Sequence, residues 1–504
     1  MSRRSLTLRW FAVLALAVAL GTLAAVGLAA RETAGSDAVR VTQLAIPERP
    51  LRTAVLDPDT LGGPEAVGGY ANLRRTGARF VRIFVNWENV APAGERKPAG
   101  FDARAPGAKE YDWARLDAQV EAAARRGFTP IVYVQTAPRW AQGCSRGPGP
   151  CRPRPSDLAD FLTAAARRFS GGFRGLPRVR YWQVWNEPNL NFYLMPQADA
   201  SGRPVSPDVF RPMLNAAYDA IHAVRRDNFV VAGGTAAFGN DDQQVDEVSP
   251  LLFLRRLFCL SDDPTPRVVC RKRVRLDAWG HHPYTSGSPT HHARLADDVS
   301  LPDLWKMRRL LQIAQKAGTL QAPRPVELWV TEFAWDTSPP DPKGVPEELH
   351  ARWVAEALYR MWDQGVSLAT WFLLRDQEWG KGGPFQSGLY FNGGSGVASD
   401  RAKLALTAFR FPFVAFREPR RKAVRFWGRS PAGRAEVVVE REAAGSWQKL
   451  VVLRPNRFGV FAGRFPSTAR DGFLRARLAS GSDASLPFSL VVPPDRPGCP
   501  WGTC

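Results

Sequence analysis

The chain has 504 residues, of which 45% are hydrophobic and 23% are charged. These proportions are typical of a folded globular protein, and the length is sufficient for one large core and a smaller second domain. The formal net charge is +20. No run of five or more basic residues occurs, which favours a dispersed basic surface, and no nucleic-acid partner is expected.

The first 30 residues have the features of an export segment. Arg3, Arg4 and Arg9 precede an uncharged apolar run from 11 to 30, which ends in small residues that suit a cleavage site. The run is also long enough to span a bilayer, so a cleaved signal peptide and an N-terminal membrane anchor are both open. We therefore expect an exported protein, extracellular or on the cell surface, that contacts the membrane only through this segment. Residues 31–50 are a polar, Pro-containing linker.

From residue 51 to residue 416, short apolar runs alternate with windows of helical periodicity. The runs that predict strands are 51–56, 80–84, 130–134, 179–184, 229–232, 276–280, 326–330 and 367–372. The windows that predict helices are 111–126, 158–169, 209–225, 251–260, 304–317 and 347–364. This alternation predicts an α/β fold, a parallel (β/α)8 TIM barrel. An open doubly wound sheet usually carries a Gly-rich turn after its first strand, whereas Asp57-Pro58-Asp59 stands there.

After residue 412 the pattern changes to short alternating runs separated by Gly, Pro and Ser turns. These runs are 423–427, 435–440, 449–453, 460–465, 473–478 and 488–492. They predict a C-terminal antiparallel β-sandwich, whose bounds are set at 417–494. Between residues 413 and 494 there are 15 Lys+Arg and 6 Asp+Glu. Such a basic domain could bind an anionic cell-envelope polymer, or it could serve only to pack against the barrel.

The six cysteines fall in three close pairs. They are Cys144 with Cys151, Cys259 with Cys270, and Cys499 with Cys504. Short closed loops suit disulfides better than a zinc site, and paired cysteines indicate an oxidising compartment. The third pair would close a tail at 495–504, and the first would stiffen a loop at the barrel mouth.

Two carboxylates follow predicted strands. Glu187 lies in Trp185-Asn186-Glu187-Pro188-Asn189 after the fourth strand, and Glu332 follows the seventh. Active sites of β/α barrels lie at the C-terminal ends of the strands, so the two carboxylates are expected to face each other. Glycoside hydrolysis needs such a pair, one carboxyl protonated to assist the leaving oxygen and one ionised to attack or stabilise the sugar.

The two motifs around these carboxylates resemble those of glycoside hydrolase clan A, the retaining barrel enzymes. The motif Trp185 to Leu190 is similar to that of family 39, whereas His282-Pro283-Tyr284 and Trp371 are similar to cellulase-like family 5. The third strand departs from family 5, since Val134 to Pro138 contains no His. The resemblance spans about residues 51–416.

The resemblance also implies roles for individual residues. Glu187 would be the acid/base and Glu332 the nucleophile. The implied substrate-binding and supporting residues are Asn186 at the sugar 2-hydroxyl, Arg82 and Tyr284 beside Glu332, His282, and Trp371 as the floor of the subsite. No cofactor is implied.

Aromatic residues follow several strands. Trp87, Trp140, Trp335 and Trp379 could stack on sugar rings in a polysaccharide cleft, or could pack the loops. The pairs His281-His282 and His291-His292 lack the spacing of a zinc helix, so no metal site is expected. Two other functions remain open, namely a catalytically silent polysaccharide-binding protein and a transglycosylase that uses the same carboxylates.

Overall fold

The computed structural model describes residues 40–493 except residues 146, 240–246, 264, 381, 382 and 384. The predicted export segment at 1–30, residues 31–39 of the linker, and the pair Cys499 and Cys504 lie outside the described residues. In the part of the chain that is described, no helix is long and apolar enough to cross a bilayer.

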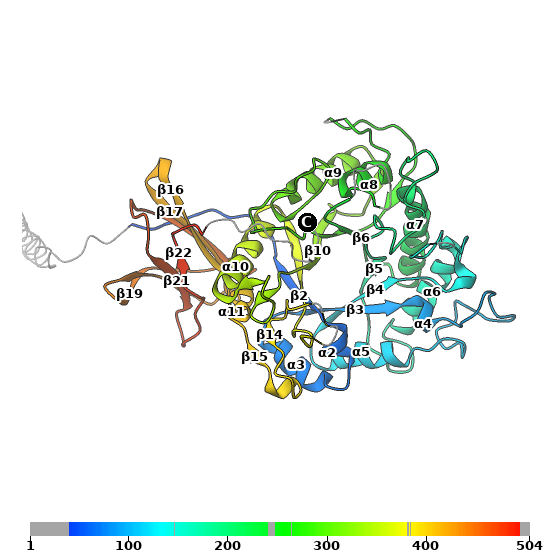
Figure 1. The fold of residues 1–504 in the computed structure, drawn as a ribbon, viewed down its shortest axis with the longest axis horizontal. Coiled ribbons are helices and arrows are strands. Elements are labelled where there is room, and N and C mark those ends of the chain that lie inside the picture. Colours follow the sequence, from blue (N-terminus) through cyan, green and yellow to red (C-terminus); the bar gives the residue numbers. More distant parts are fainter. Residues whose placement is uncertain are drawn as a thin grey trace, which may run out of the picture. The chain divides into compact units, whose positions relative to one another are not determined.

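Parallel strands close into an eight-stranded barrel surrounded by helices (Figure 1). In chain order the strands are β2 (Arg52–Leu56), β3 (Phe80–Asn86), β4 (Thr129–Gln135), β5 (Tyr181–Val184), β6 (Phe229–Ala236), β8 (Ala278–His282), β10 (Glu327–Phe333) and β13 (Val366–Phe372). Strand β13 pairs in parallel with both β10 and β2, which closes the ring. Each strand overlaps one predicted apolar run, so the predicted TIM barrel is confirmed.

Helices connect the strands on the outside of the barrel. They are α2 (Pro58–Gly62), α3 (Ala66–Arg75), α4 (Trp87–Val90), α5 (Ala114–Arg125), α6 (Pro155–Arg168), α7 (Ser206–Val224), α8 (Pro250–Leu257), α9 (Leu304–Lys316), α10 (Glu347–Asp363) and α11 (Leu404–Arg410). Every predicted helical window overlaps one of them. In α6, for example, Leu158, Phe161 and Leu162 form a buried stripe at helical spacing.

The first two helices were not predicted from the periodicity. Their segment contains four glycines between residues 62 and 69, and glycine weakens a helical pattern. Helix α2 begins with a side-chain cap instead, because the backbone N–H of Thr60 donates to Asp57 Oδ1 at 2.8 Å.

Shorter elements lie in the connections. The strand pairs are β7 (Val274–Arg275) with β9 (Leu320–Gln321), β11 (Thr337–Ser338) with β12 (Val345–Pro346), and β14 (Tyr390–Phe391) with β15 (Arg401–Ala402). The 3₁₀ turns are η1 (Arg139–Ala141), η2 (Leu301–Asp303), η3 (Val397–Ser399) and η4 (Pro419–Arg421).

The interior of the barrel changes from apolar to polar along the strands. The apolar layer consists of Ala54, Phe80, Ile131, Val231, Ala278, Trp329 and Leu368, with Tyr181 and Phe229 packed against it. Successive inward-facing residues are two positions apart in a strand. Arg82 follows Phe80 and Gln183 follows Tyr181 in this way, so the next layer toward the C-terminal ends carries polar groups.

The C-terminal region folds into two antiparallel sheets, as predicted. One sheet has the order β1 (Thr42–Gln43), β20 (Val460–Pro466), β17 (Ala423–Arg429) and β16 (Phe413–Glu418). The other has the order β19 (Ser446–Leu453), β18 (Val437–Ala443), β21 (Phe473–Leu478) and β22 (Phe488–Ser489). The domain limits differ from the prediction, because β16 starts before residue 417 and the expected linker contributes β1 to this domain.

The β-sandwich packs on helix α10 of the barrel. Tyr359 contacts Phe416 with ring centroids 5.3 Å apart, and Trp362 contacts Trp427 at 5.5 Å. Arg352 donates to the backbone oxygen of Ser489 at 2.8 Å. These contacts agree with a packing role for the domain, while binding of an anionic polymer stays a prediction.

Candidate active site

Glu187 is held in a tight loop at the end of β5. Trp185 and Glu187 have positive φ angles of 72° and 39°, an unfavourable backbone conformation for residues with side chains. The loop is tied to β6, because the Glu187 N–H donates to Gly234 O at 3.0 Å and the Ala236 N–H donates to Asn189 Oδ1 at 2.9 Å. These bonds place the Glu187 side chain at the mouth of the barrel.

Glu332 lies near the end of β10, where the pairing with β13 shifts register. One carboxylate oxygen forms an ion pair with Arg82, and the other accepts from the Tyr284 hydroxyl at 3.2 Å. Arg82 lies on β3, Glu332 lies on β10, and Tyr284 lies in the loop two residues after the end of β8. The structure brings together the residues that the resemblance assigns to this carboxylate.

Arg82 connects several groups of the site. Its guanidinium is buried, donates to Asn186 Oδ1 at 2.8 Å and to Gln183 Oε1 at 3.0 Å, and lies 3.6 Å from the centroid of the Tyr133 ring. A fixed guanidinium can orient several acceptors at once. Arg82 thus fixes both the Glu332 carboxylate and the Asn186 amide.

His282 lies between the two carboxylates. Its Nδ1 is 2.8 Å from Glu187 Oε1 and 3.6 Å from Glu332 Oε2. Since both neighbours are acceptors, Nδ1 is the nitrogen that carries a proton. The two oxygens are at most about 6.4 Å apart, the sum of these two distances.

The charges around Glu332 favour its ionised form. Burial raises the pKa of the Glu332 carboxyl, but the positive charges of His282 and Arg82 outweigh burial, so the pKa lies below its ordinary value. Burial, and then the negative charge of Glu332, raise the pKa of the Tyr284 hydroxyl well above its ordinary value. Tyr284 therefore stays protonated and can donate to the Glu332 carboxylate.

Three predicted sugar-binding tryptophans are buried and do not face the cleft. Trp87 is fully buried and stacks on Phe161 at 5.4 Å, Trp140 donates to Pro92 O at 2.8 Å, and Trp335 donates to Gly287 O at 3.0 Å. The expectation that Trp87, Trp140 and Trp335 contact substrate is wrong for this structure, because loops and helices cover their rings. Trp379, by contrast, is 50% exposed.

Trp371 also differs from the expectation that it forms the subsite floor. It is fully buried, its ring lies 5.6 Å from His350 of α10, and its indole N–H donates to Ser387 O at 2.8 Å. Leu368 faces the barrel interior, so strand alternation directs Trp371 outward and its neighbour Phe372 inward. Phe372, the last residue of β13, is partly exposed, so it is the aromatic side chain of this strand that lies at the barrel mouth.

Several side chains near the carboxylates were not predicted. Gln183 and Tyr133 contact Arg82, as described above. Tyr193 lies in the loop that carries Glu187, and burial, followed by the negative charges of Glu187 and Glu332, raises the pKa of its hydroxyl. Inward alternation along β4 and β5 would have identified the first two, but Tyr193 lies in a loop where no such pattern exists.

The two cysteine pairs among the described residues form disulfides, as predicted. Cys144 bonds to Cys151 with Cα atoms 5.2 Å apart, and Cys259 bonds to Cys270 with Cα atoms 5.1 Å apart. The first lies in the loop after β4, where the Arg152 N–H donates to Met195 O at 2.9 Å. This loop is thereby joined to the loop that carries Glu187.

The remaining histidines have local partners. His281 is fully buried between Thr235 Oγ1 at 2.9 Å and Val299 O at 2.8 Å, and burial lowers its pKa to about 3. His292 lies 2.9 Å from Asp303. In the described part of the chain, no group of three or more His, Cys, Asp or Glu side chains is arranged to hold a metal ion.

Comparison with known proteins gives similarity at the level of fold. No protein-family model and no curated protein matches the chain. A family 39 glycoside hydrolase from Bacteroides cellulosilyticus WH2 is 16% identical, with a TM-score of 0.51 over 84% of this chain and 81% of that one. A glucosidase from Croceicoccus marinus is 14% identical, with a TM-score of 0.47 over 86% of this chain and 100% of that one. The resemblance to clan A glycoside hydrolases is confirmed as a likeness of fold.

Proposed function

We propose that the protein is a retaining glycoside hydrolase that cleaves O-glycosidic bonds of a polysaccharide or oligosaccharide. The observation that carries this proposal is the position of His282, whose Nδ1 contacts both Glu187 and Glu332. Carboxyl groups are about 5–5.5 Å apart in retaining glycosidases and about 6.5–9.5 Å apart in inverting ones. The upper limit of about 6.4 Å on the oxygen separation supports the retaining geometry.

Hydrolysis would proceed by two displacements. The Glu332 carboxylate attacks the anomeric carbon while Glu187 donates a proton to the leaving oxygen, giving a glycosyl–Glu332 ester and a free alcohol. Glu187 then removes a proton from water, the water oxygen attacks the anomeric carbon, and the Glu332 carboxylate leaves. Two inversions at one carbon restore its configuration.

The surrounding residues suit these steps. Arg82 and the Tyr284 hydroxyl hold Glu332 ionised and oriented for attack. Asn186, fixed by Arg82, is suitably placed to bind the sugar 2-hydroxyl. His282 would keep Glu187 in position by donating from Nδ1. The chemistry needs no cofactor.

A catalytically silent polysaccharide-binding protein would not require the polar network around Glu332. The Glu332 side chain is only 13% exposed and lies among an arginine, a tyrosine hydroxyl and a histidine, and withdrawing charged groups from water is unfavourable without a use for them. The network thus favours an enzyme. Product analysis distinguishes transfer of the glycosyl unit to a sugar from transfer to water.

The test is a screen of the purified protein against plant and bacterial polysaccharides, with the anomeric product followed by proton NMR. We expect hydrolysis with retained configuration, and loss of activity in Glu187→Ala and Glu332→Ala. Glu327→Gln is the matched control, because Glu327 lies on the same strand at the opposite end of the barrel. Activity that survives Glu332→Ala, or an inverted product, would contradict the mechanism.

Export is part of the proposal. The disulfides Cys144–Cys151 and Cys259–Cys270 are compatible with an oxidising compartment. Fractionation of expressing cells, followed by N-terminal sequencing, tests export and distinguishes a cleaved signal peptide from an anchor. Recovery of the whole protein from the cytoplasm would contradict export.

A further inference from the structure

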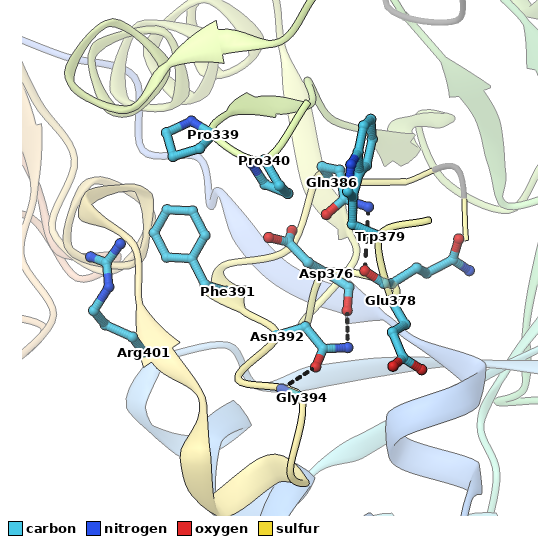
Figure 2. A pocket seen from close by; sticks show the side chains of 11 residues that line it. Pro339, Pro340, Asp376, Glu378, Trp379, Gln386, Phe391, Asn392, Gly394 and Arg401 are labelled. Carbon is cyan, nitrogen blue, oxygen red and sulfur yellow. Dashed lines mark hydrogen bonds between the residues drawn. The ribbon is translucent and has the colours of Figure 1, made fainter. Parts of the chain in front are cut away.

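A second pocket lies in the loops that follow β10 and β13, at the same end of the barrel as Glu332 (Figure 2). Its volume is about 410 Å³, within the range of small-molecule sites. Pro340, Trp379 and Phe391 supply apolar walls, and Asp376, Gln386 and Asn392 supply polar groups. None of these residues belongs to the carboxylate site described above.

The polar side of this pocket contains two buried acceptors without partners. Asp376 is 3% exposed, and its Oδ1 accepts from Lys403 Nζ at 2.6 Å, but its Oδ2 has no hydrogen-bond partner. Gln386 is fully buried, and its Oε1 has none either. Figure 2 shows the Asp376 carboxylate directed toward the space between Pro340 and Phe391. Since buried polar atoms are normally satisfied, these two oxygens call for a ligand that brings hydrogen-bond donors.

The pocket is preformed. Lys403 Nζ is fully buried and also donates to Thr337 Oγ1 at 2.7 Å and Gln386 O at 2.8 Å, which joins the loop after β10 to the loop after β13. Asn392 donates to Asp376 O at 3.1 Å and accepts from the Gly394 N–H at 2.9 Å. A ligand would therefore meet a site whose polar groups are already fixed.

The aromatic wall suits a sugar ring. Trp379 is 50% exposed, and a flat aromatic face packs well against the C–H face of a pyranose while hydroxyls at the ring edge bind polar groups. The pocket is joined to the end of β13 by an aromatic contact. The ring of Phe385, next to Gln386, lies 5.1 Å from that of Phe372.

We propose that this pocket binds a pyranose unit of the substrate chain away from the bond that is cut. The sugar face would stack on Trp379, and hydroxyl groups would donate to Asp376 Oδ2 and Gln386 Oε1. This inference rests on the proposed function, and it predicts that the protein binds long oligosaccharides better than short ones.

The test measures binding by calorimetry in full-length protein that carries Glu332→Gln, so that ligands are not consumed. The probes are disaccharides and hexasaccharides of β-1,4-glucan, β-1,4-mannan, β-1,4-xylan and β-1,3-glucan. Adding Trp379→Ala should raise the Kd of the bound hexasaccharide about tenfold, and Trp379→Phe should recover most of the affinity. Trp305→Ala is the matched control, because the Trp305 side chain is equally exposed, at 49%, but does not line the pocket. Trp305 lies in α9, where its backbone N–H donates to the side chain of Gln364 after the end of α10.

The outcomes separate this inference from the proposed function. Hydrolysis by the wild-type protein without any effect of Trp379→Ala on hexasaccharide binding would overturn the subsite alone. Binding that depends on Trp379, in a wild-type protein that hydrolyses none of the hexasaccharides, would support the subsite and count against the proposed function. An equal effect of Trp305→Ala, or no binding of any probe, would overturn the subsite.

Discussion

One strand, β10, carries a Glu–Arg ion pair at each of its ends, and the two pairs differ in their surroundings. Glu327 pairs with Arg52 near the start of the strand, where both side chains are partly exposed to solvent. Glu332 pairs with Arg82 at the other end, where the arginine side chain is fully buried. An exposed pair contributes little to stability, and a buried pair can be destabilising because both charges lose their hydration.

Backbone strain accompanies the buried ion pair at the mouth of the barrel. Thr136, Trp185 and Glu187 have positive φ angles, and all three follow strands at their C-terminal ends. The opposite end is filled by the apolar layer around Trp329. The strained loop of Glu187 and the buried Glu332–Arg82 pair thus lie where the proposed chemistry takes place, and the rest of the barrel supplies the stability that tolerates them.

The largest difference between the two ends should be in activity. Glu332→Gln keeps the shape of the side chain but removes the nucleophile, so kcat should fall about 10³-fold or more. Glu327→Gln on the same strand should leave kcat within about twofold of wild type, because that end takes no part in catalysis. Steady-state kinetics on the substrate found in the screen measures both. Equal losses of kcat in the two variants would contradict the assignment of catalysis to the Glu332 end of the strand.

The stability of the fold, in contrast to its activity, should depend most on the apolar layer at the end of the barrel opposite Glu332. Trp329 is fully buried in the apolar layer and stacks on Phe229 at 5.3 Å. Trp329→Ala would leave a large cavity, and the free energy of unfolding should fall by about 3–5 kcal/mol. Denaturant titration measures this change. A loss below about 1 kcal/mol would show that this layer does not carry the stability assigned to it.

The third prediction concerns the pH dependence of activity. Arg82 helps to keep the pKa of Glu332 below its ordinary value, so Arg82→Met should raise that pKa. The acid limb of the kcat/KM profile should move to higher pH by about one unit, since Glu332 must be ionised to attack. Arg52→Met, at the exposed pair, should leave the limb in place. An unchanged limb in Arg82→Met would mean that Arg82 does not tune this carboxyl.

The smallest effect is expected at Asp336, just beyond the end of β10. Burial raises the pKa of this carboxyl from 3.8 to about 7. The folded state thus holds the proton more tightly than the unfolded state, so the contribution of Asp336 to stability is greatest below pH 3.8 and falls as the pH rises toward about 7. Asp336→Asn should reduce the loss of stability between pH 5 and pH 8 by about 1 kcal/mol, a discounted value because local rearrangement relieves buried charge. A steeper loss of stability in the variant than in the wild type would contradict the raised pKa of Asp336.

The apolar runs were sufficient to predict the barrel. All eight barrel strands, and strands β17 to β22 of the β-domain, lie where period and composition placed them, because buried strands need continuous or alternating apolar residues. The glycine-rich segment with α2 and α3 carried too weak a helical pattern. The start of the β-domain was also missed by a few residues, since β16 follows α11 almost directly.

The carboxylate pair could be predicted because strand ends converge in a barrel. The aromatic residues could not, since the same Trp–strand spacing is compatible with a ring in the core and a ring in the cleft. Trp371 and Phe372 show this most clearly, because a shift of one residue exchanges the inside and the outside of a strand. Tyr193 and the pocket around Trp379 depend on how loops fold over one another, which a single sequence does not reveal.

The most direct test of the central claim is to trap the glycosyl–enzyme intermediate. A 2-deoxy-2-fluoro glycoside of the sugar identified in the screen should react once and remain attached to the protein. Mass spectrometry of the digested protein should then find the added sugar on the peptide that contains Glu332, and on Glu332 itself. A label on any other residue, or turnover with inverted configuration and no label, would contradict the assignment of Glu332 as the nucleophile of a retaining glycosidase.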